Sequence, residues 1–75
     1  MYNFTKLINN ARPLNYEDEG SDRQVDADCE LHDALLDHYG TDLVAYWINK
    51  TEANRMTADE SLNFLADELK SGDWV

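Results

Sequence analysis

The sequence has few of the residues that cross-link or break a chain: its 75 residues include one cysteine, one proline and three glycines. A single cysteine, Cys29, cannot form an internal disulfide, and small secreted domains usually carry several. No apolar run approaches the roughly 18 residues of a membrane span, and no secretory signal follows Met1. We therefore expect a cytoplasmic domain that makes no contact with a membrane.

Positive charge is also scarce. Six Lys and Arg residues stand against 16 Asp and Glu residues, which gives a formal net charge of −10. Binding to nucleic acids or to anionic membranes depends on clustered Lys and Arg, and the six here are scattered along the chain. The composition therefore argues against direct binding of nucleic acid and favours a partner with a basic surface.

Helix-capping signals predict an all-α fold for a single small domain over residues 1–75. Asn3 should cap a short helix over Phe4–Ala11, which Pro13 ends. Ser21 and Gln24 form a capping-box pair for a second helix ending at Gly40. An acidic connector over residues 13–20 joins these two helices.

Two further helices complete the expected compact bundle of three main helices plus the short N-terminal one. The third begins at Thr41 and should fray near residues 51–54. The fourth opens with a second capping box, Thr57 and Glu60, and ends at Ser71–Gly72. Residues 73–75 form a C-terminal tail, in which Trp74 is expected to fold back on the core.

Apolar periodicity predicts which helix faces are buried. In the second helix one stripe stands out, flanked by Leu31 and Leu35, and it consists of Val25, Cys29, His32, Leu36 and Tyr39. In the third helix the expected buried residues are Leu43, Val44, Trp47 and Ile48. In the fourth helix they are Ala58, Leu62, Leu65 and Leu69.

Acidic residues are concentrated in residues 17–42, which hold ten of the 16 acids and one base, Arg23. Five of the acids recur at helical spacing and form one ridge along the second helix, here called the acidic ridge: Asp22, Asp26, Glu30, Asp33 and Asp37. At about 1.5 Å of rise per residue the ridge is about 22 Å long. Its successive carboxylates lie about 4.5–6 Å apart along the axis, close to the roughly 3.4 Å rise per nucleotide. The ridge is either a solubilising face or a binding surface for a basic partner.

Cys29 and His32 are the residues that suggest metal binding or nucleophilic chemistry. The pair shares a helix face and has Asp33 and His38 nearby, but a structural zinc site needs four ligands, usually from two segments. A nucleophilic Cys–His pair needs a third, orienting group and a pocket. We therefore expect neither a metal nor a cofactor, and no enzymatic activity.

Two aromatic residues, Tyr46 and Phe64, fall outside the main apolar stripes of their helices. They are candidates for a second buried face, a homodimer interface or a contact with a partner. The sequence does not separate these three roles, and the same question applies to Trp74.

The acidic connector residues Glu17, Asp18 and Glu19, together with the acidic ridge, give the chain a resemblance to a class of small acidic inhibitors encoded by bacteriophages. This class includes anti-restriction and anti-CRISPR proteins that imitate nucleic acid. The resemblance covers residues 17–37 and rests on size and charge placement. It implies an inhibitor, acting in the host cytoplasm, that blocks a basic nucleic-acid-binding surface of a host defence or DNA/RNA-processing protein.

A second hypothesis needs no binding role for the ridge. The chain would be a small helical adaptor or regulatory subunit that binds its partner through hydrophobic helix faces. The acidic ridge would then serve solubility, and binding would depend on residues such as Tyr46 and Phe64.

Overall fold

The computed structural model describes residues 2–72 and 74, and within them it contains helices and no strand. The all-α class and the four expected helices are confirmed. They are α1 (Phe4–Ala11), α2 (Asp22–His38), α3 (Thr41–Ala53) and α4 (Ala58–Ser71), and a short 3-10 turn, η1 (Tyr16–Asp18), lies between α1 and α2.

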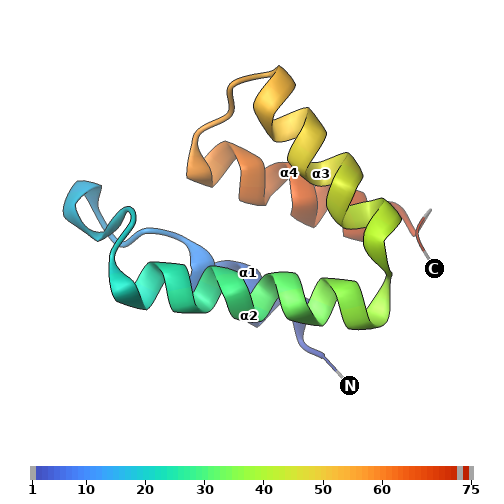
Figure 1. The fold of residues 1–75 in the computed structure, drawn as a ribbon, viewed down its shortest axis with the longest axis horizontal. Coiled ribbons are helices and arrows are strands. Elements are labelled where there is room, and N and C mark those ends of the chain that lie inside the picture. The colour runs from blue at the N-terminus through green and yellow to red at the C-terminus, as the bar shows by residue number, and fades with distance from the viewer. Residues whose placement is uncertain (1, 73, 75) are drawn as a thin grey trace.

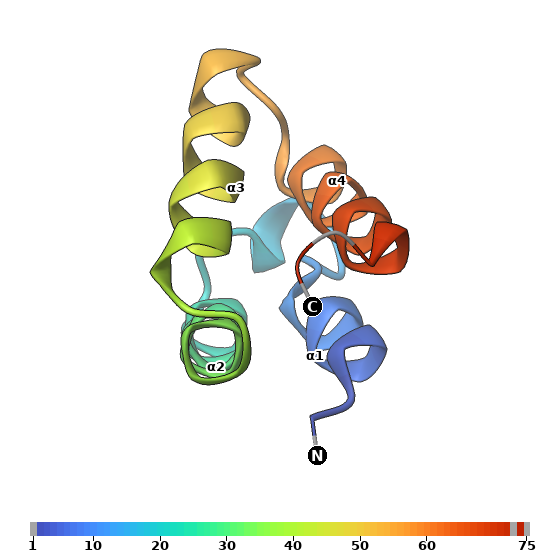
Figure 2. The ribbon, with the colours of Figure 1, turned by 90° about the vertical axis from the view of Figure 1, so that its right-hand side faces the viewer.

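The helices form two layers (Figure 1). α1 lies beside α2 in one layer, and α3 and α4 make up the other. Viewed along α2, the four helices occupy the corners of the bundle, and α3 crosses α2 steeply (Figure 2). One long side of α2 is therefore left without a helical neighbour among residues 2–72 and 74.

Three helices, α1, α2 and α4, begin at residues whose side chains cap the helix, as the sequence predicted. Asn3 accepts a hydrogen bond from the backbone N–H of Lys6 at 3.1 Å. Thr57 and Glu60 form the full capping box, with both bonds at 3.2 Å. These caps satisfy N–H groups that have no partner within the helix.

The second capping pair departs from the expected pattern on one side. Ser21 accepts from the N–H of Gln24 at 3.2 Å, as predicted. The amide oxygen of Gln24, however, accepts from the N–H of Gly20 at 3.3 Å, one residue before the N-cap. The N–H of Ser21 is already used, because it donates to the carbonyl of Asp18.

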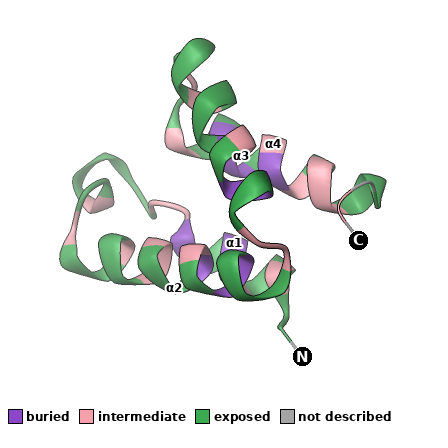
Figure 3. Ribbon diagram, turned by 45° about the vertical axis from the view of Figure 1, so that its right-hand side comes forward, coloured by how far each residue is buried: buried purple, intermediate pink, exposed green. Residues whose placement is uncertain are grey.

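The core lies between the two layers (Figure 3). Its largest fully buried side chains are leucines from three helices, Leu31, Leu35, Leu43 and Leu65. α1 contributes Ile8 and Ala11 from the other side of the core. Leu62 and Leu65 are buried as predicted in α4, while Ala58 and Leu69 are only partly buried.

The predicted buried stripe of α2 is wrong at three of its five positions, whereas Tyr39 packs against the core and His32 is half-buried. Val25 and Leu36 are 46 % and 42 % exposed, and Cys29 is exposed as well. The buried residues of α2 are instead Leu31, Ala34 and Leu35. The helix is rotated by about 125° from the expected orientation, because α1 and the α3–α4 layer meet it on the Leu31 side.

The prediction for α3 is confirmed at three of four positions. Leu43, Val44 and Trp47 are buried, whereas Ile48 is 38 % exposed. α3 continues to Ala53, so the expected fraying from residue 51 is not seen. The chain then turns through Arg55, which has a positive φ of 49°.

Candidate functional site

All five side chains of the acidic ridge are exposed on α2. Among residues 2–72 and 74, no ridge carboxylate forms an ion pair; the pairs found there are Arg12–Asp59, Arg23–Asp18 and His32–Asp28. Asp37 accepts a hydrogen bond from the hydroxyl of Tyr2 at 2.7 Å, and this bond raises the pKa of Tyr2. The ridge therefore keeps its negative charge uncompensated and open to solvent.

Asp18, which the sequence grouped with the ridge, is used inside the protein. Its carboxylate is bonded by the guanidinium of Arg23, by the N–H of Leu14 at 2.8 Å and by the hydroxyl of Ser21 at 2.7 Å. These bonds hold the pKa of Asp18 well below its usual range. With its side chain only 13 % exposed, Asp18 is a structural residue that offers little surface to a partner.

Arg23 is consumed by the same cluster. Besides Asp18, its guanidinium donates to the carbonyls of Asn10 at 2.8 Å and Arg12 at 2.9 Å, at the C-terminal end of α1. A cation is favourable at this position because the last carbonyls of a helix carry partial negative charge. The one base within residues 17–42 thus joins α1, η1 and α2 and does not neutralise the ridge.

Glu17 and Glu19 flank this internal cluster and are exposed. η1 lies at the N-terminal end of α2 (Figure 1). The two glutamates therefore add negative charge at the same end of the molecule as Asp22.

An exposed apolar surface lies next to the acidic ridge, and the sequence analysis missed it because it assigned these residues to the core. We call it the apolar seam, and its residues are the exposed Val25, Cys29 and Leu36 together with the half-buried His32. At 100° per residue the seam is centred about 90–100° around α2 from the ridge. The solvent-facing half of α2 is therefore divided lengthwise into an apolar side and an acidic side.

The apolar seam borders α3. His32 packs edge-on against Trp47, with ring centroids 5.1 Å apart. The exposed Ile48 lines a small depression together with His32 and Asp28. The seam is consequently supported from one side by α3, while its opposite edge meets the carboxylates of the ridge.

Tyr46 and Phe64 form a second cluster with Trp74, in the layer made by α3 and α4. The ring of Tyr46 lies 5.9 Å from that of Phe64 and 5.4 Å from that of Trp74. Phe64 and Trp74 also pack against the core, which confirms that Trp74 folds back. The indole N–H of Trp74 donates to Glu68 at 3.1 Å. All three rings are half-buried, so the cluster resembles a secondary core more than a free surface.

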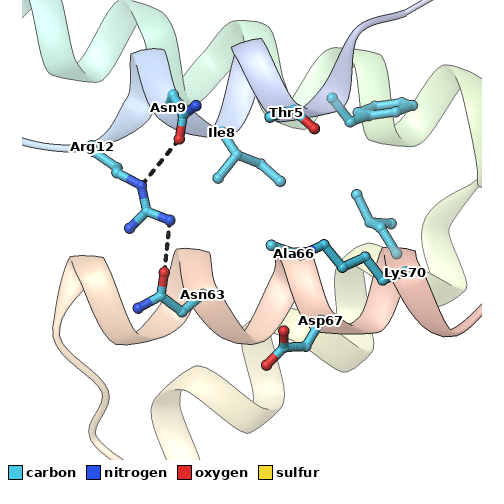
Figure 4. Close-up of a pocket in the computed structure, with 10 residues that line it drawn as sticks. Thr5, Ile8, Asn9, Arg12, Asn63, Ala66, Asp67 and Lys70 are labelled. Carbon is cyan, nitrogen blue, oxygen red and sulfur yellow. Dashed lines mark hydrogen bonds between the residues drawn. The ribbon is translucent and has the colours of Figure 1, made fainter.

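A groove of about 590 Å³ runs between α1 and α4 (Figure 4). Phe4, Ile8, Ala66 and Leu69 supply its apolar lining. At one end Arg12 reaches from α1 to α4, donating to Asn63 at 2.7 Å and to Asn9 at 3.4 Å. It also pairs with Asp59 at 3.4 Å, so this guanidinium is occupied on three sides.

Within the part of the chain that the structure describes, no three His, Cys, Asp or Glu side chains gather as metal ligands would. None of its helices is both long enough and apolar enough to cross a membrane.

No protein-family model, curated protein or solved structure matches this chain. Its surfaces are therefore the basis on which a function can be proposed.

Proposed function

We propose that the chain is a non-enzymatic inhibitor that binds another protein through the acidic ridge and thereby blocks a basic, nucleic-acid-binding surface. The observation that supports this function is the ridge itself: five exposed carboxylates on one helix, with no Lys or Arg paired to them among residues 2–72 and 74. Such a surface attracts clustered Lys and Arg.

The geometry of α2 fits imitation of a nucleic-acid strand. A helix holds its side chains at fixed intervals, and the ridge carboxylates are spaced about 4.5–6 Å apart along the axis. Phosphates along one strand have a rise of about 3.4 Å per nucleotide, which is shorter than the carboxylate spacing. The long Lys and Arg side chains of a basic channel can adjust to this difference and meet several carboxylates at once. The inhibitor would compete with nucleic acid for that channel.

The ridge is maintained at a cost to stability, which also supports a binding role. Like charges at i, i+4 each destabilise a helix by about 0.2–0.5 kcal/mol. Asp33 and Asp37 lie near the C-terminal end of α2, where negative charge is unfavourable. A face needed only for solubility would not require acids at these positions.

The second candidate is an adaptor or regulatory subunit, and the exposed apolar seam favours it. In that case apolar contacts would provide most of the affinity, and binding would depend little on salt. The acidic ridge would contribute solubility alone.

A matched pair of variants distinguishes these two functions. The ridge variant carries D26N, E30Q and D33N, and the control variant carries D42N, E52Q and D67N, so both lose three negative charges. All six positions are exposed. The tagged native protein and both variants are used to capture partners from bacterial lysate at low and high salt, and the partners are identified by mass spectrometry.

We expect the native protein and the control variant to capture a nucleic-acid-binding protein at low salt and to displace labelled DNA or RNA from it. The ridge variant should lose both activities. Capture of the same partner by all three proteins, retained at high salt, would contradict the inhibitor function and support the adaptor.

A further inference from the structure

The apolar seam of α2 has the residue spacing of a helix that pairs with another helix. Val25, Cys29, His32 and Leu36 follow one another at intervals of four, three and four residues. This is the alternation that brings one side of a helix against a partner helix in a coiled coil. In the part of the chain that the structure describes, α3 covers the His32 edge, and the other three seam residues are exposed.

Acidic residues occupy the positions beside the seam. Asp26 and Asp33 follow Val25 and His32 directly, and both belong to the acidic ridge. In paired helices the residues at these flanking positions lie next to side chains of the partner helix, and their charges determine which partner binds. A partner on the seam would therefore place residues next to Asp26 and Asp33.

We propose that the apolar seam and the acidic ridge together dock one amphipathic α-helix of the partner protein. That helix would carry apolar residues facing the seam and Lys or Arg residues facing Asp26 and Asp33. The inference rests on the proposed function and deepens it, because it identifies the blocked basic surface as one face of a helix. Binding of an amphipathic helix by its apolar face is a common mode of protein recognition.

Charge complementarity selects this occupant over a second copy of the chain. Two copies paired antiparallel through their seams would bring the Asp26 and Asp33 flanks of both chains together. Like charges opposed in this way repel each other, and each chain carries a formal net charge of −10. A basic helix turns the same contacts into attractions.

The dimensions of the seam set the length of the partner. Val25 to Leu36 spans about 16 Å along the axis, which corresponds to about three turns of helix. A partner segment of about 12–15 residues would cover it. Covering Val25 and Leu36 would bury apolar surface that the fold leaves in contact with water.

Three synthetic helical peptides of about 15 residues test the inference. The first has leucines at coiled-coil spacing and flanking lysines, the second keeps the leucines but has flanking glutamates, and the third keeps the lysines but has serines in place of leucine. Affinity is measured by calorimetry. Cys29, as the single cysteine, reports occupancy of the seam through its rate of alkylation by N-ethylmaleimide.

We expect the leucine–lysine peptide to bind about tenfold more tightly than either of the other two. It should also slow the alkylation of Cys29. The double variant V25S/L36S should weaken its binding by about tenfold, because the burial of two partly exposed apolar side chains is lost. L14S is the matched control, since Leu14 is 77 % exposed and lies in the connector, and it should bind like the native protein.

Two results would overturn the inference. One is equal affinity of the protein for the leucine–lysine and serine–lysine peptides, with no protection of Cys29 from alkylation. The proposed function would still be supported in that case if capture of a partner from lysate depended on the acidic ridge and on salt. The other is a dimer in sedimentation experiments at low salt that protects Cys29 without any peptide. Conversely, the proposed function alone fails if the leucine–lysine peptide binds as expected but the protein never displaces nucleic acid from a partner.

Discussion

At the scale of single residues, a count of charges does not show which charges are available to a partner. Asp18 and Glu19 are neighbours in an acidic connector, and they differ completely in role. Asp18 is bonded by Arg23 and by groups of Leu14 and Ser21, whereas Glu19 faces solvent. Asp18 and Glu19 differ in role because Asp18 contacts Arg23, which bonds to the C-terminal end of α1. The residue types alone do not show which of the two carboxylates is used inside the protein.

Asp18→Asn is expected to destabilise the protein at pH 7, because the ion pair with Arg23 and two further hydrogen bonds are weakened. The folded state lowers the pKa of Asp18 below the roughly 3.9 of an unfolded chain. Its stabilisation is therefore complete above about pH 4 and is lost as the pH falls further. The variant should accordingly lose less stability than the native protein between neutral and strongly acidic pH.

Urea unfolding followed by circular dichroism at both pH values measures this difference. Glu17→Gln serves as the control, since Glu17 is exposed in the same turn. An unchanged unfolding midpoint for Asp18→Asn at pH 7 would show that the cluster does not stabilise the native state.

At the scale of elements, helix limits were predictable and helix faces were not. The caps at Asn3, Ser21 and Thr57 are formed by residues within four positions of each other, so the local sequence specifies them. α2 carries apolar residues on two adjacent faces, and Leu31 and Val25 both fit a helical period. Only the packing of α1 and the α3–α4 layer selects the Leu31 face.

The same reasoning explains which parts of the candidate site were found. The acidic ridge depends on helical spacing alone, and the structure places its five residues on one exposed side of α2. The apolar seam could not be found from the sequence, because it consists of residues that would be core if α2 were rotated by about 125°. The sequence did not predict the groove between α1 and α4 either. Its residues come together only in the folded chain, since Arg12 and Asn63 are 51 residues apart.

Truncation of α2 on each face tests this assignment. Leu31→Ala should destabilise the protein by about 2–5 kcal/mol, because it removes a fully buried side chain and leaves a cavity. Val25→Ala should cost less than about 1 kcal/mol, since Val25 is nearly half exposed. Denaturant unfolding of both variants gives the two values. The reverse order would show that the Val25 face is buried in solution, either within the chain or in a self-associated form.

The ridge variant D26N/E30Q/D33N is expected to be more stable than the native protein. Each i, i+4 repulsion that it removes contributes about 0.2–0.5 kcal/mol. The control variant D42N/E52Q/D67N should gain less, because it relieves no run of like charges and loses Asp42 from the first turn of α3, where an acid is favourable. Thermal unfolding of the three proteins in low salt measures this. A ridge variant that melts below the native protein would show that the acids stabilise α2, and the stability argument for a binding role would fail.

At the scale of the whole molecule, the uneven distribution of charge has kinetic consequences. Residues 17–42 hold ten of the 16 acids, so the electrostatic field is strongest around α2 and η1. A field of this kind accelerates encounter with a basic surface and guides it toward the acidic side of the molecule. Once the complex has formed, close contacts rather than net charge determine how long it lasts.

The last prediction separates these two effects in the association of the protein with the leucine–lysine peptide. The ridge and control variants lose the same net charge, but only the ridge variant loses it from the side of α2 that guides the encounter, so its association rate should fall more than that of the control. Only the ridge variant loses the carboxylates that would contact the peptide lysines, so its dissociation should be distinctly faster and its affinity less dependent on salt. Stopped-flow measurements at several salt concentrations give both rates. If the two variants had equal dissociation rates, the acidic ridge would act only through net charge, and direct contact between ridge and partner would be ruled out for this peptide.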